Sequence, residues 1–207
     1  MSRGKYIVLE GLDGSGKTTQ YARIMDFLGP KTLGVREPGG TAIAEEIRTL
    51  LKNKALPRAP STNIFLFSAA RTDLVETVIR PNLQAGRHVV SDRNWLSTVA
   101  YQQAEGAPVA DILTLSQLAT KECFEPDLLL LIDVSPEVCE QRLSERGGDA
   151  DYFETKGRAY FTKVREAYLA HARTLKNSEI IDGHQSPEAV WAAIHAILVE
   201  KGWQGAI

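Results

Sequence analysis

The feature that most constrains this chain is a glycine-rich segment near its start, Gly11-Leu12-Asp13-Gly14-Ser15-Gly16-Lys17-Thr18-Thr19. Four residues separate Gly11 from Gly16, a spacing that lets successive backbone N–H groups surround a phosphate while Lys17 adds a positive charge. The apolar run 6–9 before it is typical of a strand, and residues 19–28 after it are typical of a helix. The segment therefore predicts a phosphate-binding loop, although a glycine-rich turn before a helix is the plain alternative.

Such a loop predicts ATP or GTP as a ligand, with the hydroxyl of Thr18 offered to Mg²⁺. Proteins that switch on GTP use the same loop, and they read guanine with an Asn-Lys-x-Asp element after a strand. The Asn-Lys pair of this chain occurs in Asn53-Lys54-Ala55-Leu56, which lacks the aspartate. This argues against a GTP switch, so we expect a phosphotransferase, which needs a second site for its acceptor.

Short β-branched or leucine-rich runs alternate with helical patterns along the chain. The expected strands are residues 6–9, 88–91, 128–134 and 179–181. The expected helices, besides 19–28, are residues 41–52, 61–80, 111–122, 136–146, 151–175 and 187–201. The strand runs do not alternate strictly with polar residues, as expected where helices cover both faces of a sheet. This order predicts an α/β fold with a doubly wound parallel sheet, in a single domain that spans residues 1–207.

Composition argues against several other classes of protein. The 24 basic and 26 acidic residues give a net charge of −2, so no overall field favours nucleic acid or an anionic membrane. Cys123 and Cys139 belong to no Cys-x-x-Cys pair, which argues against a disulfide scaffold or a zinc site. The N-terminus lacks a signal-peptide core, and no apolar run approaches the ~20 residues of a membrane span. We expect a cytoplasmic protein that binds neither nucleic acid nor a membrane.

Three further segments are candidates for the acceptor site. Residues 36–41, Arg-Glu-Pro-Gly-Gly-Thr, place charged side chains beside a rigid turn, although they could form only a turn. Phe67 and Arg71 are four residues apart and share one helical face, where they could stack a base and bond its carbonyl edge. The alternative is a core phenylalanine and a surface arginine. Asp92 and Arg93 end an expected strand, at the sheet edge where α/β folds bind ligands.

These segments together resemble the thymidylate kinases. The resemblance rests on motifs in the family's order: the loop with Asp13, Arg36-Glu37-Pro38-Gly39-Gly40-Thr41, Leu66-Phe67-Ser68-Ala69-Ala70-Arg71, Asp92-Arg93-Asn94-Trp95-Leu96-Ser97-Thr98-Val99-Ala100-Tyr101-Gln102, Glu125-Pro126-Asp127-Leu128 and Ile181-Asp182-Gly183. It covers nearly the whole chain. It implies a P-loop NTPase fold of the nucleoside monophosphate kinase type, with five parallel strands flanked by helices. It also implies transfer of phosphate from MgATP to dTMP, in dTTP synthesis, by a homodimer packed through helices.

At the base and sugar of the acceptor, the resemblance implies roles for five residues. Phe67 would stack on thymine, and Arg71 would bond its carbonyl edge. Thr98 and Gln102 would face the remaining polar atoms of the base. Tyr101 would crowd the 2′ position of the sugar and so favour deoxyribose.

Five more residues are implied to act near the phosphates. Arg48 and Arg93 would hold the acceptor phosphate, because bidentate arginine suits a phosphate dianion. Asp13 and Glu37 would lie near the acceptor sugar or the metal. Asp92 would contact Mg²⁺ through one of its ligands and not directly, or it would orient Arg93.

The expected chemistry needs no general base. A phosphate monoester has a second pKa of ~6, so most of the acceptor is already the nucleophilic dianion at neutral pH. The protein has to align two anions and neutralise the transferred phosphoryl group with Lys17, Mg²⁺ and arginines. One branch of the family places an arginine inside the phosphate-binding loop, and this chain has none there.

The other branch supplies arginines from a flexible lid, usually with an Asp-Arg-x-Glu element. The corresponding residues here are Asp151-Tyr152-Phe153-Glu154, with a tyrosine in place of the arginine. We therefore expect a lid at about residues 142–155, with Arg142 and Arg146 as its catalytic arginines and Arg158 as a third candidate. The alternative is that Arg142 and Arg146 form the solvated face of a helix, since they are four residues apart.

Two other functions stay open at this point. The first is a kinase for another nucleoside or nucleoside monophosphate, because Asn94 stands where an aromatic residue is common in the family. The second is a nucleotide-binding regulator that has lost turnover, because the lid element is altered.

Overall fold

The computed structural model describes residues 2–147 and 152–203. Within these residues, five parallel strands form one sheet in the order β2-β3-β1-β4-β5. Their bounds are β1 (Tyr6–Glu10), β2 (Leu33–Arg36), β3 (Val89–Asp92), β4 (Leu128–Asp133) and β5 (Ser178–Asp182). The chain leaves the central strand β1 for the edge strand β2, returns to β3 and then crosses to β4. This is the doubly wound parallel sheet that the sequence predicts.

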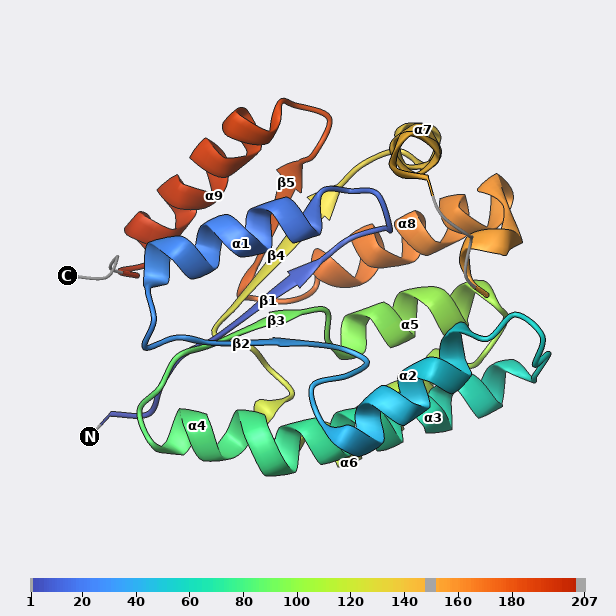
Figure 1. Ribbon diagram of the computed structural model, residues 1–207, viewed down its shortest axis with the longest axis horizontal. Helices are drawn as coiled ribbons and strands as arrows, with labels where there is room; N and C mark the ends of the chain where they lie inside the picture. The colour runs from blue at the N-terminus through green and yellow to red at the C-terminus, as the bar shows by residue number, and fades with distance from the viewer. Residues whose placement is uncertain (1, 148–151, 204–207) are drawn as a thin grey trace.

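Helices cover both faces of this sheet (Figure 1). One face carries α1 (Lys17–Leu28) and α9 (Pro187–Glu200), and the other carries α5 (Trp95–Ala104) and α8 (Arg158–Ala172). The remaining helical elements are α2 (Ala42–Lys52), α3 (Pro60–Leu74), the π-helical η1 (Val75–Ile79), α4 (Arg80–Gln84), α6 (Val109–Thr120), η2 (Lys121–Cys123), α7 (Pro136–Arg146) and η3 (Glu154–Lys156). No helix of the described residues is long and apolar enough to cross a membrane.

The central strand shows why this sequence forms a buried sheet. Every residue of β1 is buried. Because side chains alternate across a strand, Tyr6 and Val8 join one apolar cluster with η1 and α4, while Ile7 and Leu9 join a second that includes α1. Both faces of β1 are thus covered, and the glycine-rich segment that follows it is fixed at the carboxyl edge of the sheet.

Three elements differ from the sequence-based expectation. The expected helix 61–80 is continued through η1 into α4 and ends at Gln84. The expected helix 151–175 begins only at Arg158, because Gly157 has a left-handed φ of 79°, and residue 151 lies outside the described residues. The strand β2 was not expected from a sequence run, since it contains Gly34 and only Val35 is buried.

Helix α5 is also absent from the sequence-based expectation. Seven of its ten residues are buried, so it shows no polar face and therefore little helical periodicity. It begins at Asn94, whose side chain accepts a hydrogen bond from the N–H of Leu96 at 2.8 Å. Such a cap satisfies one of the free N–H groups of the first turn. It places Thr98 and Tyr101 of α5 beside the end of β3.

Candidate active site

The phosphate-binding loop adopts a backbone that needs glycine. Gly11 and Gly14 have φ of 145° and 84°, which side chains with a Cβ atom rarely adopt. A Cβ on Gly14 would also lie 2.7 Å from the carbonyl oxygen of Cys139 in α7. The loop is therefore packed directly against α7, and it leads into the N-terminus of α1, where N–H groups lack helical partners.

Lys17 is folded back onto this loop. Its Nζ donates hydrogen bonds to the carbonyl oxygens of Gly11 at 2.9 Å and Leu12 at 2.8 Å. Burial, helped by the charge of Arg93, lowers the pKa of Lys17. Thr18 and Thr19 are exposed in the first turn of α1. The loop therefore offers a buried cation, free N–H groups and hydroxyls at one point.

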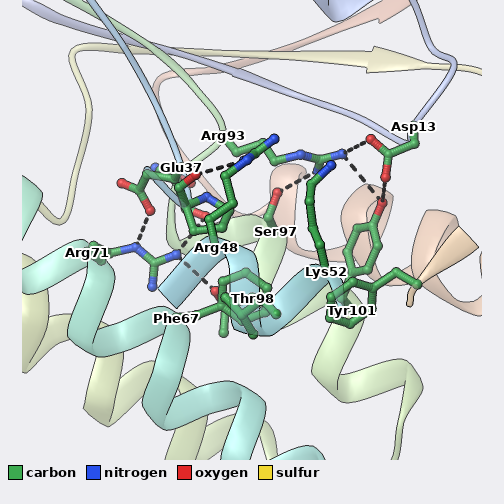
Figure 2. A pocket seen from close by; sticks show the side chains of 14 residues that line it. Asp13, Glu37, Arg48, Lys52, Phe67, Arg71, Arg93, Ser97, Thr98 and Tyr101 are labelled. Carbon is green, nitrogen blue, oxygen red and sulfur yellow. Dashed lines mark hydrogen bonds and ion pairs between the residues drawn. The ribbon is translucent and has the colours of Figure 1, made fainter. Parts of the chain in front are cut away.

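An ion pair joins the loop to the end of β3 (Figure 2). Arg93 Nη2 donates to Asp13 Oδ1 at 2.8 Å, and the hydroxyl of Tyr101 donates to Asp13 Oδ2 at 3.2 Å. Burial acts against ionisation of Asp13, but the charges of Arg93 and Lys17 outweigh it and hold the pKa of this carboxyl well below its ordinary value. At neutral pH this acid and this arginine are both charged.

Arg93 is held from several directions. Its Nη1 donates to the hydroxyl oxygens of Ser97 at 2.8 Å and Tyr168 at 2.9 Å. Both hydroxyls also lie within 3.0 Å of the buried carboxylate of Glu10. The backbone of Arg93 has a left-handed φ of 77°, and its backbone N–H donates to the carbonyl oxygen of Leu9 at 2.8 Å. The guanidinium is therefore fixed in one position at the carboxyl edge of the sheet.

A second, buried ion pair lies deeper under the same edge. Arg71 Nε donates to Glu37 Oε2 at 2.6 Å, and Arg71 Nη2 donates to Thr98 Oγ1 at 2.9 Å. The Arg71 side chain is 1% exposed, so the surface-charge alternative is wrong. Burial raises the pKa of Glu37, against the charge of Arg71. Arg71 Nη1 and Glu37 Oε1 are buried without a hydrogen-bond partner among the described residues.

A cavity of about 110 Å³ connects the two ion pairs. Phe67 forms one side of it, on the face of α3 that also carries Arg71. Its lining residues come from the loop, from β2 and β3 ends, from α2, α3 and α5, and from the segment before α8: Asp13, Glu37, Pro38, Arg48, Leu51, Lys52, Phe67, Arg71, Arg93, Asn94, Ser97, Thr98, Tyr101 and Phe153. The cavity has an aromatic end and a cationic end, which suits a phosphorylated molecule with a planar ring.

Comparison with known proteins agrees with this geometry. The family model described as thymidylate kinase matches residues 9–194. The chain belongs to the thymidylate kinase family. The thymidylate kinase of Thermosipho africanus is 38% identical over 203 residues, which are 96% of this chain and 99% of that protein. The thymidylate kinase of Chromohalobacter salexigens is 40% identical over 209 residues, covering 97% and 98% of the two chains.

A solved structure supports the fold. The thymidylate kinase of Candida albicans superposes with a TM-score of 0.79, covering 97% of this chain and 93% of that chain at 24% identity. The predicted family and the predicted P-loop fold of the nucleoside monophosphate kinase type are therefore confirmed. As a member of the thymidylate kinase family, the chain is a phosphotransferase, as the sequence also predicts.

The structure does not bring every residue implied by the thymidylate kinase resemblance into the cavity. Gln102 is fully buried and does not line it. Its Nε2 lies 3.4 Å from Glu105 Oε2, while its Oε1 has no hydrogen-bond partner among the described residues. Arg48 does line the cavity, and its Nη1 donates to the carbonyl of Pro38 at 2.7 Å.

The expected lid arginines lie on the side of α7. Arg142 Nη2 donates to the carbonyl of Gly183 at 3.0 Å, and its Nη1 lies 3.5 Å from the carbonyls of Gly14 and Ser15 in the loop. Arg146 is exposed and pairs with Glu154 at 3.2 Å. Arg158 is also exposed and pairs with Glu140 at 2.6 Å. Of the lid expected at about 142–155, residues 148–151 lie outside the described residues.

The structure adds three residues that the sequence did not indicate: Ser97 and Tyr168, which hold Arg93, and Phe153, which lines the cavity. Ser97 belongs to the motif after Asp92, so it could have been inferred from its neighbours. Tyr168 lies 75 residues from Arg93 in the chain, and its helix gives no local signal for such a contact.

Proposed function

We propose that this chain transfers the γ-phosphoryl group of MgATP to dTMP, forming ADP and dTDP for dTTP synthesis. The observation that carries the proposal is the ion pair of Arg93 with Asp13. It joins the phosphate-binding loop to a cavity with an aromatic wall, so that a donor bound at the loop and an acceptor in the cavity meet at Arg93. Membership of the thymidylate kinase family supports both substrates.

ATP would bind at the loop from Gly11 to Thr19. The backbone N–H groups at the start of α1 would surround its phosphates, as helix N-termini do for anions. The ammonium of Lys17, which now bonds two loop carbonyls, would bond phosphate oxygens instead. A charged group that is already buried loses little further hydration in this exchange, so Lys17 is suited to neutralise the transferred group.

The residues near the loop fit Mg²⁺, which prefers oxygen ligands and keeps several waters. Thr18 presents its hydroxyl at the start of α1, and Asp92 Oδ1 is buried without a hydrogen-bond partner among the described residues. These residues would hold the ion directly or through water. No group of three or more His, Cys, Asp or Glu side chains in the described residues could hold a metal alone, as expected for an ion that arrives with ATP. When bound, Mg²⁺ supplies positive charge between the phosphates.

The base of dTMP would occupy the aromatic end of the cavity. Phe67 offers a ring face for stacking. Arg71 Nη1, which is buried and unpaired among the described residues, would donate to a carbonyl oxygen of thymine. Thr98 would act mainly by orienting Arg71, because its Oγ1 accepts a hydrogen bond from Arg71 Nη2 at 2.9 Å. Gln102 does not line the cavity, so it would support the lining residues and would not contact the base.

The phosphate and sugar of dTMP would lie at the cationic end. Arg93 and Arg48, which both line the cavity, would hold the dianion, which needs no general base to attack ATP. Tyr101 lines the cavity beside Asp13 and donates to it, so its ring would leave little room for a 2′-hydroxyl. Glu37 would hold Arg71 in place through the 2.6 Å bond.

The catalytic arginines would come from α7, which contains both Arg142 and Arg146. Arg142 approaches the loop from α7, within 3.5 Å of two loop carbonyls. Arg146 lines a cavity of about 260 Å³ that also includes Asp13. We propose that both contact the transferred phosphoryl group, as part of a lid at about 142–155 in a single P-loop kinase domain.

We also propose that the chain forms a homodimer through α2, α3 and α6. These helices pack on one another on one side of the molecule. They carry large apolar side chains that are exposed: Ile43, Leu50, Phe65 and Leu118. A second copy of the chain would cover these side chains, since exposed apolar residues gathered on neighbouring elements are typical of interfaces.

The proposed activity is tested by a panel of acceptors. The protein is incubated with MgATP and, separately, dTMP, dUMP, UMP, CMP, AMP and dGMP, and ADP release is measured for each. We expect the highest kcat/KM with dTMP. Preferred turnover of UMP, CMP or AMP would contradict the proposal, and binding of ATP and dTMP by calorimetry without ADP release would favour a regulator.

A further inference from the structure

Residues 152–156, here called the strap, lie just before α8, and Phe153 among them lines the acceptor cavity. The strap is attached to the end of α2 at Tyr152. The N–H of Tyr152 donates to the carbonyl of Lys52 at 3.3 Å. The guanidinium carbon of Arg58 lies 4.2 Å from the centroid of the Tyr152 ring, a favourable cation–π distance.

Arg58 is itself firmly held. Its Nε donates to Asn63 Oδ1 at 2.6 Å, and its Nη1 donates to the carbonyl of Leu56 at 2.9 Å. Its Nη2 donates to the carbonyl of Leu51 near the end of α2. Because these hydrogen bonds occupy N–H groups at the edge of the planar guanidinium, its flat face is left for contact with a neighbouring ring. That face is the one on which Tyr152 stacks.

The other end of the strap is attached to Glu105, the residue that follows α5. Lys156 Nζ forms an ion pair with Glu105 Oε1 at 2.9 Å, and the Glu105 side chain is only 5% exposed. The same Nζ lies 4.7 Å from the Tyr152 ring centroid. The ring of Tyr152 is therefore contacted by two cations, one from the α2–α3 connection and one from the strap itself.

Between these attachments, Phe153 points into the acceptor cavity. Its ring centroid lies 5.9 Å from that of Phe67 and 5.7 Å from that of Tyr101. Phe153 is 8% exposed and lines the cavity. Since the Phe67 and Phe153 rings are tilted and too close for a base to fit between them, Phe153 forms a side wall beside the stacking face.

We propose that Tyr152 is a positioning residue that holds Phe153 as the side wall of the acceptor cavity, and that this wall sets the preference for a pyrimidine over a purine. The inference rests on the proposed function, in which the base of dTMP occupies this cavity. A purine is larger than thymine, so a side wall at Phe153, next to the stacking face of Phe67, would exclude it by steric overlap. Tyr152 acts through Phe153 and does not touch the substrate.

The test compares four variants: Tyr152→Ala, Phe153→Ala, the double variant, and Tyr152→Phe as the matched control that keeps the ring on Arg58. The measurements are kcat and KM for dTMP and for dGMP, and KM for ATP. We expect Tyr152→Ala and Phe153→Ala each to raise the KM for dTMP about tenfold. Each should leave the KM for ATP unchanged and lower the ratio of kcat/KM for dTMP over dGMP.

The double variant decides whether the two residues act as one unit. We expect it to match Phe153→Ala, because Tyr152 has no role once the wall is gone. Tyr152→Phe should stay within about twofold of the unmodified protein, since the cation–π contact remains. Multiplied effects in the double variant, or an unchanged dTMP KM and dTMP-over-dGMP ratio in Tyr152→Ala, would overturn the proposal.

A further set of measurements distinguishes loss of folding from loss of the proposed role. Thermal melting checks each variant, and if Tyr152→Ala does not fold, Arg58→Gln removes the partner of the Tyr152 ring instead. It should raise the dTMP KM in the same way, and an unchanged KM would overturn the proposal. Failure of the unmodified protein to phosphorylate dTMP contradicts the proposed function, whereas normal turnover with insensitive variants contradicts only the role of the strap.

Discussion

Arg93 and Asp13 meet at 2.8 Å although they come from different crossovers of the sheet, Arg93 from the end of β3 and Asp13 from the loop after β1. Parallel strands place their carboxyl ends at one edge, so residues 80 positions apart in sequence become partners. Through this pair, the donor side and the acceptor side of the site share one charged contact.

Replacing Arg93 with alanine should weaken capture of dTMP far more than binding of ATP. The lost charged contact and the unpaired Asp13 should together cost about 2 to 5 kcal/mol in kcat/KM for dTMP. Steady-state kinetics with each substrate varied in turn measure this. Arg23→Ala is the control, since Arg23 pairs with Glu188 far from the cavity. Equal losses of affinity for both nucleotides would contradict the assignment.

Glu37→Gln should destabilise the folded protein, because it leaves the buried charge of Arg71 without its counter-ion. Breaking a buried pair in this way costs about 3 to 5 kcal/mol, which urea unfolding measures. Glu188→Gln, at a surface pair, should change stability little. If Glu37→Gln unfolded at the same urea concentration as the unmodified protein, Glu37 would not be the group that stabilises Arg71.

Asp13→Asn should change how stability depends on acid. The pKa of Asp13 is lower in the folded protein than its ordinary value of 3.8. Its ionised form therefore stabilises the fold above pH 3.8, and this contribution is lost as pH falls through the folded pKa. Melting temperatures measured from pH 5 to about pH 2 should fall less steeply in Asp13→Asn than in the unmodified protein. Parallel curves would show that Asp13 is not held ionised.

Arg142→Ala and Arg146→Ala should each lower kcat by about tenfold or more, with a modest change in the KM for dTMP. Such a pattern is expected for contacts made mainly in the transition state. Arg23→Ala is the control, because Arg23 pairs with Glu188 on α9 and was never a candidate for the lid. Unaltered turnover in Arg146→Ala would favour a solvated helix face for that residue.

Phe65→Glu should convert the proposed dimer to a monomer, because it places a charge among exposed apolar side chains of α2, α3 and α6. Light scattering after size-exclusion chromatography measures the mass. Val199→Glu is the control, since Val199 is an exposed apolar residue of α9, on the other side of the molecule. A monomer without any substitution would rule out the proposed homodimer.

Much of the fold could be predicted from the sequence, because β1, β3 and β4 are buried on both faces and therefore appear as apolar runs. The edge strand β2 could not, since its partial exposure leaves no such run. Helix α5 was missed for the opposite reason, because most of its sides are buried. Hydrophobic periodicity in a sequence indicates only those elements that have one exposed and one buried face.

The candidate site divides in a similar way. Contiguous motifs indicated the loop, Arg71 and Arg93, and the structure brings them to one edge. The sequence could not decide whether Arg71 was exposed, because burial of an arginine depends on a distant partner, here Glu37. Tyr168 and Phe153 gave no signal, since Tyr168 of α8 reaches Arg93 and Phe153 of the strap reaches the cavity through tertiary packing alone.

The left-handed φ of 77° at Arg93 means that the arginine paired with Asp13 lies where the backbone prefers glycine or asparagine. A side chain in this region costs on the order of 1 kcal/mol. The side chain of Arg93 offsets this cost through its hydrogen bonds to Asp13, Ser97 and Tyr168. Glycine at this position would therefore relax the backbone but leave Asp13 without its counter-ion.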